Sequence, residues 1–374
     1  MTTPSSGPIS AQHINTELGY PTTQQLSLND SAVRTLAGVS SGTISYNDLR
    51  GKSSFTAVAA TGPTAPGYNT YDIGGYRYHI YRDNPPLWQR PSVSPHFLNV
   101  TNTGTEQSIQ YLIVAGGASG GGHYGGGGGA GGVRYGTAPL PATGSFNLHI
   151  GSGGDPRSGY GSSYYVGDDG NDSYVQFPSG TITSTGGGGG AVRVGGAGRP
   201  GGSGGGGTNS GGAAGTGNTP PVSPPQGNPG GAAGFFTNGG GGGGGAGSAG
   251  TQPGYHGTPS PTVTSAAPGG PGGNGVTTNF INANSPSIPS WMPTSWKNAV
   301  GPTGIFGGGG GGGHGSLPAG AGGPGGGGAG GSSATSGTPG ISYTGGGGGG
   351  AAQSVWASAS GAGGNGIVIL KYPL

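Results

Sequence analysis

Runs of consecutive glycine constrain this chain more than any other feature of its sequence. Glycine has no side chain to bury and loses more backbone entropy on ordering than any other residue, so glycine-rich chains are ordinarily disordered. Here 101 of 374 residues are glycine, 32 are proline, and only 29% are hydrophobic. Any folded core must therefore contain few side chains. The main runs lie at 125–129, 186–190, 204–207, 239–245, 307–313, 325–328 and 345–350.

Two continuous apolar segments bound the glycine-rich region and argue for order. Residues 109–117 read IQYLIVAGG, and residues 366–374 read GIVILKYPL. Continuous apolar runs of this length are typical of strands that are buried on both faces. We expect them to pair with each other or with a neighbour, which predicts one glycine-rich domain over residues 108–374.

The glycine runs themselves predict a backbone core. The Gly-X-Y period of collagen is not sustained, which argues against a collagen stalk. Pure glycine can instead form extended threefold helices of the polyproline II type, which rise about 3.1 Å per residue. Such helices can pack side by side and hydrogen-bond through their exposed N–H and C=O groups. A run of seven glycines would then span roughly 20 Å.

The N-terminal segment has helix signals instead of glycine runs. In ISAQHINTELG, Ser10 can cap a short helix and Gly19 can end it. In LSLNDSAVRTLAG, Asn29 or Asp30 can cap a second helix that Gly38 ends.

A third short element follows in SYNDLRGKS, where Ser45 and Asp48 have the spacing of a capping box. Three such elements are too small for an independent core, so we expect residues 1–55 to fold against a partner surface. A simple N-terminal subdomain is the alternative. The candidate docking residues are Ile14, Leu18, Val33, Leu36, Leu49 and Arg50.

Residues 56–107 predict a small β connector to the glycine-rich body. YRYHIYRD, from Tyr76 to Asp83, alternates aromatic or apolar residues with polar ones, and PHFLNVTN, from Pro95 to Asn102, does so more weakly. The predicted fold class is therefore mainly β with polyglycine II-type helices, a short α-helical docking segment and a glycine-rich sandwich body.

Charge and composition argue against several classes of protein. The net charge is +2, only 6% of residues are charged, and no Asp or Glu follows Asp172, so we expect neither nucleic-acid binding nor a polybasic membrane anchor. No apolar run is long enough to span a bilayer, and the start lacks the features of a secretory signal, which predicts synthesis in a cytoplasm without membrane insertion. The chain has no cysteine for disulfides or a thiolate metal site.

Two stretches of this sequence resemble known phage proteins. The pattern FLNVTN…YLIVAGGASGGG…GGGGGAGG, which ends in GGNGIVILKYP, resembles the glycine-rich domain of bacteriophage tail fibres and other virion surface proteins over residues 95–374. Separately, ISAQHINTELG…LSLNDSAVRTLAG…SGTISYNDLRGKS resembles the N-terminal segment of many phage tail proteins. The resemblance implies a virion protein. By analogy with the tip adhesins of T-even-like phages, it also implies a sandwich of polyglycine helices whose loops at one end touch the host receptor.

No catalytic or metal signature stands out from the sequence. G-x-G-x-x-G recurs by chance in this composition and lacks the context of a nucleotide-binding loop. The tract VGDDGNDS, with Asp168, Asp169, Asn171 and Asp172, offers oxygen ligands for Ca²⁺ but lacks EF-hand spacing, which favours a solvated turn. Lone histidines more often make hydrogen bonds than bind metal. The histidines in question are His123, His256 and His314. We therefore expect no enzyme activity, catalytic residue, cofactor or metal.

Aromatic residues in proline-stiffened or glycine-flanked segments are the candidate contacts. Such side chains offer large contact areas at low entropy cost, as at binding hot spots. The alternative is that they cover a thin core or a subunit interface, and both readings stay open. The candidates are Trp291, Met292 and Trp296, with Phe235, Phe236, Tyr255, His256 and Trp356.

The sequence as a whole predicts a phage tail or tail-fibre component located in the virion. We expect residues 1–55 to bind other virion proteins, a homotrimer to form, and loops of the glycine-rich domain to bind a host surface polysaccharide or outer-membrane protein. The alternative is a purely structural baseplate, neck or capsid-decoration protein without receptor binding. A glycine-rich protein of a bacterial envelope is a third reading, which the absent signal argues against.

Overall fold

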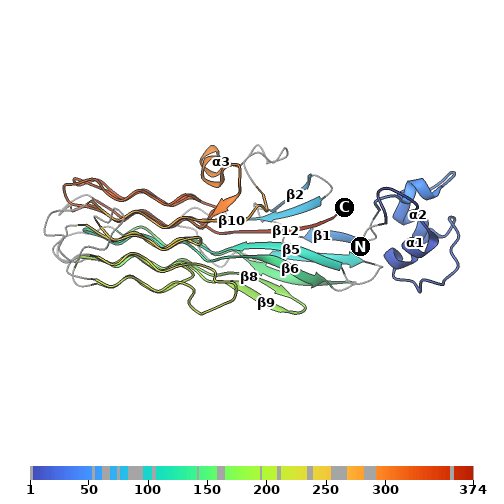
Figure 1. The fold of residues 1–374 in the computed structure, drawn as a ribbon, viewed down its shortest axis with the longest axis horizontal. Coiled ribbons are helices and arrows are strands. Elements are labelled where there is room, and N and C mark those ends of the chain that lie inside the picture. Colours follow the sequence, from blue (N-terminus) through green and yellow to red (C-terminus); the bar gives the residue numbers. More distant parts are fainter. Residues whose placement is uncertain are drawn as a thin grey trace.

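Two five-stranded antiparallel sheets form the centre of the molecule in the computed structural model (Figure 1). The structure describes residues 3–52, 55–60, 68–73, 76–82, 96–102, 107–140, 143–157, 165–193, 196–208, 212–233, 239–253, 268–281, 292–353 and 358–373. The first sheet has the order β1 (Phe55–Ala60), β4 (His96–Asn102), β7 (Thr143–His149), β8 (Ser173–Phe177) and β9 (Gly180–Ser184). The second has the order β2 (Tyr68–Ile73), β3 (Tyr76–Tyr81), β12 (Ile367–Pro373), β5 (Gln107–Val114) and β6 (Val133–Leu140).

The two apolar segments that bound the glycine-rich region pair with each other, as predicted. β5 and β12 are adjacent antiparallel strands in the middle of the second sheet, with Leu112 opposite Ile369. Both strands are buried on both faces, which explains their continuous apolar sequences. The strands predicted around Tyr76 and Pro95 are confirmed as β3 and β4. Because β3 pairs with β12 and β4 pairs with β7, the segment 56–107 contributes strands to both sheets.

Apolar side chains cover both faces of the second sheet. One cluster lies between the two sheets and joins Ile113 and Val368 to Leu98 and Leu148. A second cluster lies on the outer face. It is covered there by α3 (Thr294–Val300) and by the small hairpin of β10 (Val276–Thr277) and β11 (Ile305–Phe306).

The strands continue directly into the glycine runs, which extend the molecule away from the sheets (Figure 1). β5 leads into residues 115–121, a turn at 122–124 reverses the chain, and residues 125–132 return to β6. β11 likewise leads into residues 307–313. The runs thus reach outward and come back, and their turns gather at the far end.

The run 125–132 lies inside a bundle of other runs and hydrogen-bonds to six of them. Its successive N–H groups donate hydrogen bonds to three neighbouring runs in turn, so that every third N–H donates to the same run. Gly126 and Gly129 donate to Ala191 and Gly188, Gly127 and Ala130 donate to Gly241 and Gly244, and Gly128 and Gly131 donate to Gly348 and Gly345, all at 2.8–2.9 Å. Its carbonyl groups accept from three further runs, at 115–121, 203–206 and 310–313. The core of this part is therefore hydrogen-bonded backbone.

Close approach of the backbones explains why these positions are glycine. A Cβ atom added at Gly127 would lie 2.0 Å from the carbonyl oxygen of Gly310, and one added at Gly310 would lie 2.1 Å from that of Gly348. Neither oxygen can move aside without breaking the hydrogen bonds around it. A side chain is thus excluded at Gly127 and Gly310.

Residues 3–52 form a small helical unit at the opposite end of the molecule (Figure 1). The predicted caps are confirmed: Ser10 and Gly19 flank α1 (Ala11–Leu18), and Asp30 and Gly38 flank α2 (Ser31–Ala37). The third element is a short 3₁₀ helix (Tyr46–Leu49) with the predicted capping box. In the part of the chain that the structure describes, no helix is long and apolar enough to cross a membrane.

Candidate functional site at the tip of the glycine runs

The turns that join the glycine runs meet at one end of the molecule, which we call the tip: residues 122–124, 314–317 and 332–335 with Tyr165, Arg193 and Gln353. The backbone of His314 bridges to Gly239 on one side and to Ser332 on the other. The N–H of Gly122 donates to the carbonyl oxygen of Tyr165 at 3.2 Å. These bonds tie segments that are far apart in the sequence into one surface. The tip faces away from α1 and α2 (Figure 1).

The turn at 122–124 holds two bulky residues in an unfavourable backbone conformation. His123 and Tyr124 have φ angles of 46° and 55°, in the left-handed region that costs roughly 1–2 kcal/mol for a residue with a Cβ. Both side chains are buried, and their rings meet edge to face with centroids 4.9 Å apart. Burial, together with the charge of Arg193, lowers the pKa of His123. The neutral ring thus packs under the surface of the tip.

Two arginines near this turn lie against tyrosine rings. The guanidinium carbon of Arg193 is 5.0 Å from the ring centroid of Tyr124, and that of Arg157 is 6.0 Å from the ring centroid of Tyr165. Contacts of this kind are worth about 0.5–1 kcal/mol at exposed sites. Tyr165 is 49% exposed. The tip therefore presents an aromatic surface and cationic groups held in place by packing.

The acidic tract 166–173 is part of the body and not the solvated turn that we expected. Residues 165–172 are an extended segment that leads into β8. Asp168 pairs with Arg157, Asp169 accepts from the N–H of Gly189 at 2.8 Å, and Asp172 accepts from the N–H of Gly186 at 2.8 Å. The three carboxylates thus bind separate groups of the protein. Among the described residues, no cluster of three or more His, Asp or Glu side chains could hold a metal ion.

His314 has the hydrogen-bonding role expected of a lone histidine. Its Nδ1 accepts from the N–H groups of Ser316 at 3.0 Å and Leu317 at 2.7 Å, so the proton of the neutral ring is on Nε2. The ring is fully buried, and burial lowers its pKa. His314 thus fixes the turn 314–317. His256 lies outside the described residues.

Met292 and Trp296 belong to the core, so their reading as receptor contacts is wrong. Both are buried in the cluster on the outer face of the second sheet. The indole N–H of Trp296 donates to the carbonyl oxygen of Tyr343 at 3.0 Å, and its ring meets that of Phe306 edge to face. The alternative reading, that they cover a thin core, describes these two residues. Trp291, Phe235, Phe236, Tyr255, His256 and Trp356 lie outside the described residues.

The described residues that flank three of these candidates nevertheless belong to runs that reach the tip. Gly239, which follows the segment containing Phe235 and Phe236, bridges to His314. Gln353, which precedes the segment containing Trp356, lies near Gly315. Tyr165 and Arg193 could not be predicted from the sequence, because no local pattern shows which turns share one end.

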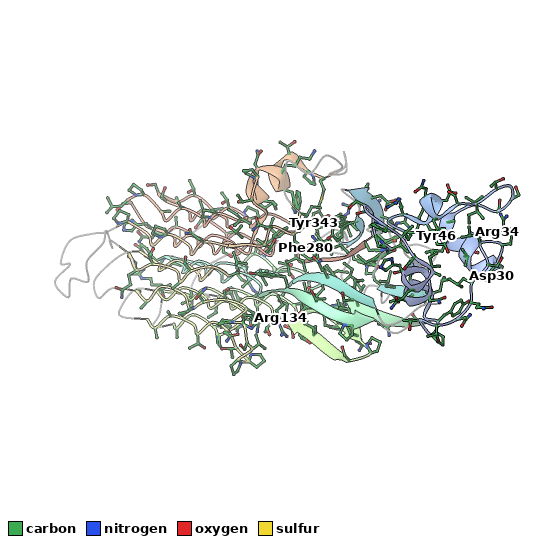
Figure 2. All side chains as sticks on the ribbon, turned by 45° about the vertical axis from the view of Figure 1, so that its right-hand side comes forward. Asp30, Arg34, Tyr46, Arg134, Phe280 and Tyr343 are labelled. Atoms are coloured by element: carbon green, nitrogen blue, oxygen red, sulfur yellow. The ribbon has the colours of Figure 1, made fainter. Side chains whose placement is uncertain are left out.

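The predicted docking residues of the N-terminal segment face one another. Ile14, Leu18, Val33, Leu36 and Leu49 are all buried in one small cluster, and the other described residues that pack in it also belong to residues 3–52. Arg50 donates to Asn47 at 2.9 Å and to the carbonyl oxygen of Gly7. The outer surface of this unit is formed instead by residues such as Asp30, Arg34 and Tyr46 (Figure 2). Tyr46, 40% exposed, is its largest exposed apolar side chain.

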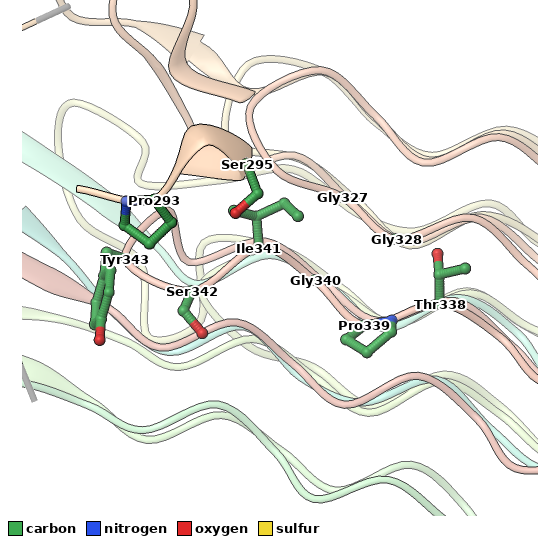
Figure 3. A pocket seen from close by; sticks show the side chains of 10 residues that line it. All are labelled: Pro293, Ser295, Gly327, Gly328, Thr338, Pro339, Gly340, Ile341, Ser342 and Tyr343. Carbon is green, nitrogen blue, oxygen red and sulfur yellow. The ribbon is translucent and has the colours of Figure 1, made fainter. Parts of the chain in front are cut away.

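A groove of about 560 Å³ lies between the start of α3 and two glycine-run turns (Figure 3). It is lined by glycine, proline, hydroxyl-bearing and aliphatic side chains, with Tyr343 at one end. The lining residues contain no carboxylate, imidazole or amine, and Tyr343 is the titratable group among them.

Comparison with known proteins identifies the glycine-rich region. No curated protein matches the chain significantly. The sequence pattern of the glycine-rich domain family matches residues 96–373, from the first residue of β4 to the last residue of β12. The match covers seven of the ten strands of the two sheets, all the glycine runs and the tip, and it leaves out β1, β2 and β3. The chain therefore belongs to the glycine-rich domain family.

Proposed function

We propose that this chain is a tail or tail-fibre component of a bacteriophage particle. On this proposal, residues 1–55 attach the chain to other virion proteins and the tip meets the host surface. The observation that carries the proposal is that the two ends of the molecule differ. A separate helical unit lies at one end, and the turns of the glycine runs lie at the other. The resemblance of the N-terminal segment to phage tail proteins supports the same assignment.

The glycine-rich body suits a spacer that has to stay rigid. Each backbone hydrogen bond adds about 1 kcal/mol net, and the runs make one for nearly every residue. We propose that the runs are threefold helices of the polyglycine II type. The return of every third N–H to the same neighbour supports a repeat of three residues per turn.

The remaining parts of the proposal concern assembly and chemistry. The chain acts without enzyme activity or a cofactor, forms a homotrimer, and resides in the virion after synthesis in the host cytoplasm. Its partner at the tip is a surface polysaccharide or an outer-membrane protein of the host. Burial of Met292 and Trp296 removes two candidate contacts and favours the alternative of a purely structural virion protein, so the test has to separate the two.

Binding of the labelled full-length protein to a panel of bacterial strains tests the proposal. Tyr165→Ala alters the tip, and Tyr135→Ala on β6 is its matched control, because the two rings are 49% and 47% exposed. We expect saturable binding to some strains, weakened by Tyr165→Ala and unchanged by Tyr135→Ala. Absence of binding to every strain, including the host of the particle, supports the structural alternative.

A further inference from the structure

Arg193 differs from the other described arginines near the tip in having no carboxylate partner. Arg157 pairs with Asp168, and Arg199 pairs with Asp169 at 3.2 Å. The guanidinium of Arg193 lies instead over the ring of Tyr124, and no carboxylate of the described residues lies within ion-pair distance. The sequence contains no Asp or Glu after Asp172. The runs that follow therefore add no acidic group to the tip.

Tyr165 supplies an exposed aromatic ring near the same turn, and its segment is a neighbour of the run that leads to Arg193, because the N–H of Gly167 donates to the carbonyl oxygen of Gly190 at 2.8 Å. Its backbone is fixed because its carbonyl oxygen accepts from the N–H of Gly122. The guanidinium of Arg157 lies 6.0 Å from the ring centroid, and Asp168 holds that guanidinium. The ring remains 49% exposed. An aromatic side chain held in this way can stack on the apolar face of a ring-shaped ligand.

The turn 122–124, which contacts both Arg193 and Tyr165, is already held in place. His123 and Tyr124 are buried in a left-handed conformation, and Gly315 lies against the Tyr124 ring. Folding has therefore fixed the backbone that carries Arg193 and Tyr165. Binding of a ligand then avoids the entropy cost of ordering these residues.

We infer that the tip binds an acidic polysaccharide. A sugar ring presents an apolar face that stacks on Tyr165, and the carboxylate of an acidic sugar pairs with the planar guanidinium of Arg193. Repetition of acidic sugars along the polymer allows both contacts at once. This inference rests on the proposed function, since it names the chemistry of the host surface that the tip would meet.

Immobilised acidic polymers test the inference with the full-length protein. The probes are polygalacturonate, alginate, hyaluronate and polysialic acid, with dextran as the neutral polymer. The tip variants are Arg193→Gln and Tyr165→Ala. The matched controls are Lys297→Gln, a half-exposed cation on α3, and Tyr135→Ala. Circular dichroism confirms that each variant is folded.

We expect the protein to bind at least one acidic polymer and not dextran. Each tip variant should raise Kd about tenfold, and each control should leave Kd unchanged within about twofold. No binding to any of the acidic polymers, equal binding to dextran, or equal Kd values for tip and control variants would overturn the inference. If tip variants still lose binding to bacterial cells while the acidic polymers are not bound, the proposed function stands and only the acidic-sugar inference fails. If no cells are bound, the proposed function fails.

Discussion

The N–H of Gly128 donates to the carbonyl oxygen of Gly348 at 2.8 Å, although the two glycines belong to runs near opposite ends of the glycine-rich domain. The carbonyl oxygen of Gly128 accepts in turn from the N–H of Gly310 at 2.9 Å. Three distant runs are thus joined through the two polar groups of one residue. Glycine allows this because a Cβ at position 128 would lie 2.3 Å from the carbonyl oxygen of Ala118.

Gly128→Ala should therefore destabilise the body severely. The added methyl group meets backbone that is hydrogen-bonded on every side, so we expect a loss of at least about 3 kcal/mol in the free energy of unfolding. Gly42→Ala is the control: its Cβ meets nothing within 4 Å, and only its left-handed φ of 87° adds about 1 kcal/mol of strain. Guanidinium denaturation measures both. Equal losses would show that crowding of the backbone does not decide the stability of the body.

Deletions within a run test the threefold repeat. Removing three glycines from the run 345–350 shortens it by one turn but keeps the remaining N–H groups directed at the same neighbours. Removing one or two glycines rotates every later N–H away from its acceptor. We expect the three-residue deletion to melt at a higher temperature than the other two. If the two-residue deletion is the most stable, the runs have the period of a β-strand instead.

Trp296→Ala should reduce stability without affecting the tip. The side chain is fully buried, and its removal leaves a cavity and breaks the hydrogen bond from the indole N–H to the carbonyl oxygen of Tyr343. We expect a loss of about 3–5 kcal/mol in the free energy of unfolding. Trp296→Phe should lose less, because it keeps an aromatic ring against Phe306. If a folded Trp296 variant binds bacterial cells more weakly than the wild type at a temperature where both are native, the residue has a role in binding that its burial does not explain.

His79 makes stability depend on pH. It is buried between β2 and β12, where its ring nitrogens contact the hydroxyl groups of Tyr68 at 2.9 Å and Tyr372 at 3.2 Å. Burial, with a smaller effect of the Arg77 charge, lowers its pKa from 6.5 to about 3. Because the folded pKa lies below the unfolded value, this contribution is fully present above pH 6.5 and is lost as the pH falls from 6.5 towards 3.

Denaturation at pH 7 and pH 5 measures this effect. We expect His79 to account for a loss of about 2 kcal/mol in the free energy of unfolding between the two values. His79→Gln should reduce the loss by that amount, because glutamine keeps hydrogen-bonding groups but does not titrate. His96, His123 and His314, whose pKa values burial also lowers, contribute the remainder. An unchanged pH dependence in His79→Gln would contradict the assignment.

The outer surface of the N-terminal unit, and not its core, should carry attachment to the particle. Tyr46→Ala removes an exposed ring and should leave the unit folded. It should weaken co-sedimentation of the added protein with particles that were assembled without this protein. Leu49→Ala removes a fully buried side chain and should unfold the unit itself, which hydrogen exchange of residues 3–52 would report. If Tyr46→Ala co-sediments as well as the wild type, another part of this surface makes the contact.

Local features of the sequence predicted much of the fold. Ser10, Gly19 and Gly38 mark helix ends because capping depends on adjacent residues. The apolar runs around Leu112 and Ile369 predicted buried, paired strands, because burial on both faces requires continuous apolar sequence.

Features that depend on long-range pairing could not be predicted. The insertion of β12 between β3 and β5 has no local signal, and neither does the meeting of Tyr165 with Gly122 at the tip. Trp296 is an aromatic residue in a proline-rich segment, which is typical of a contact residue. Packing of α3 and the β10–β11 hairpin on the second sheet places its ring in the core. In the same way, Asp169 and Asp172 bind backbone N–H groups of a run whose position the sequence does not show.

Accessibility of the two ends within the assembled particle tests the central claim most directly. The chain contains no cysteine, so a single introduced cysteine gives a unique label. Ser6→Cys lies on the exposed surface of the N-terminal unit, and Gln353→Cys lies at the exposed tip. The account predicts that a maleimide reagent labels both variants in the free protein, but only Gln353→Cys in intact particles. Protection of Gln353→Cys with free reaction of Ser6→Cys, or equal reaction of both, would contradict it.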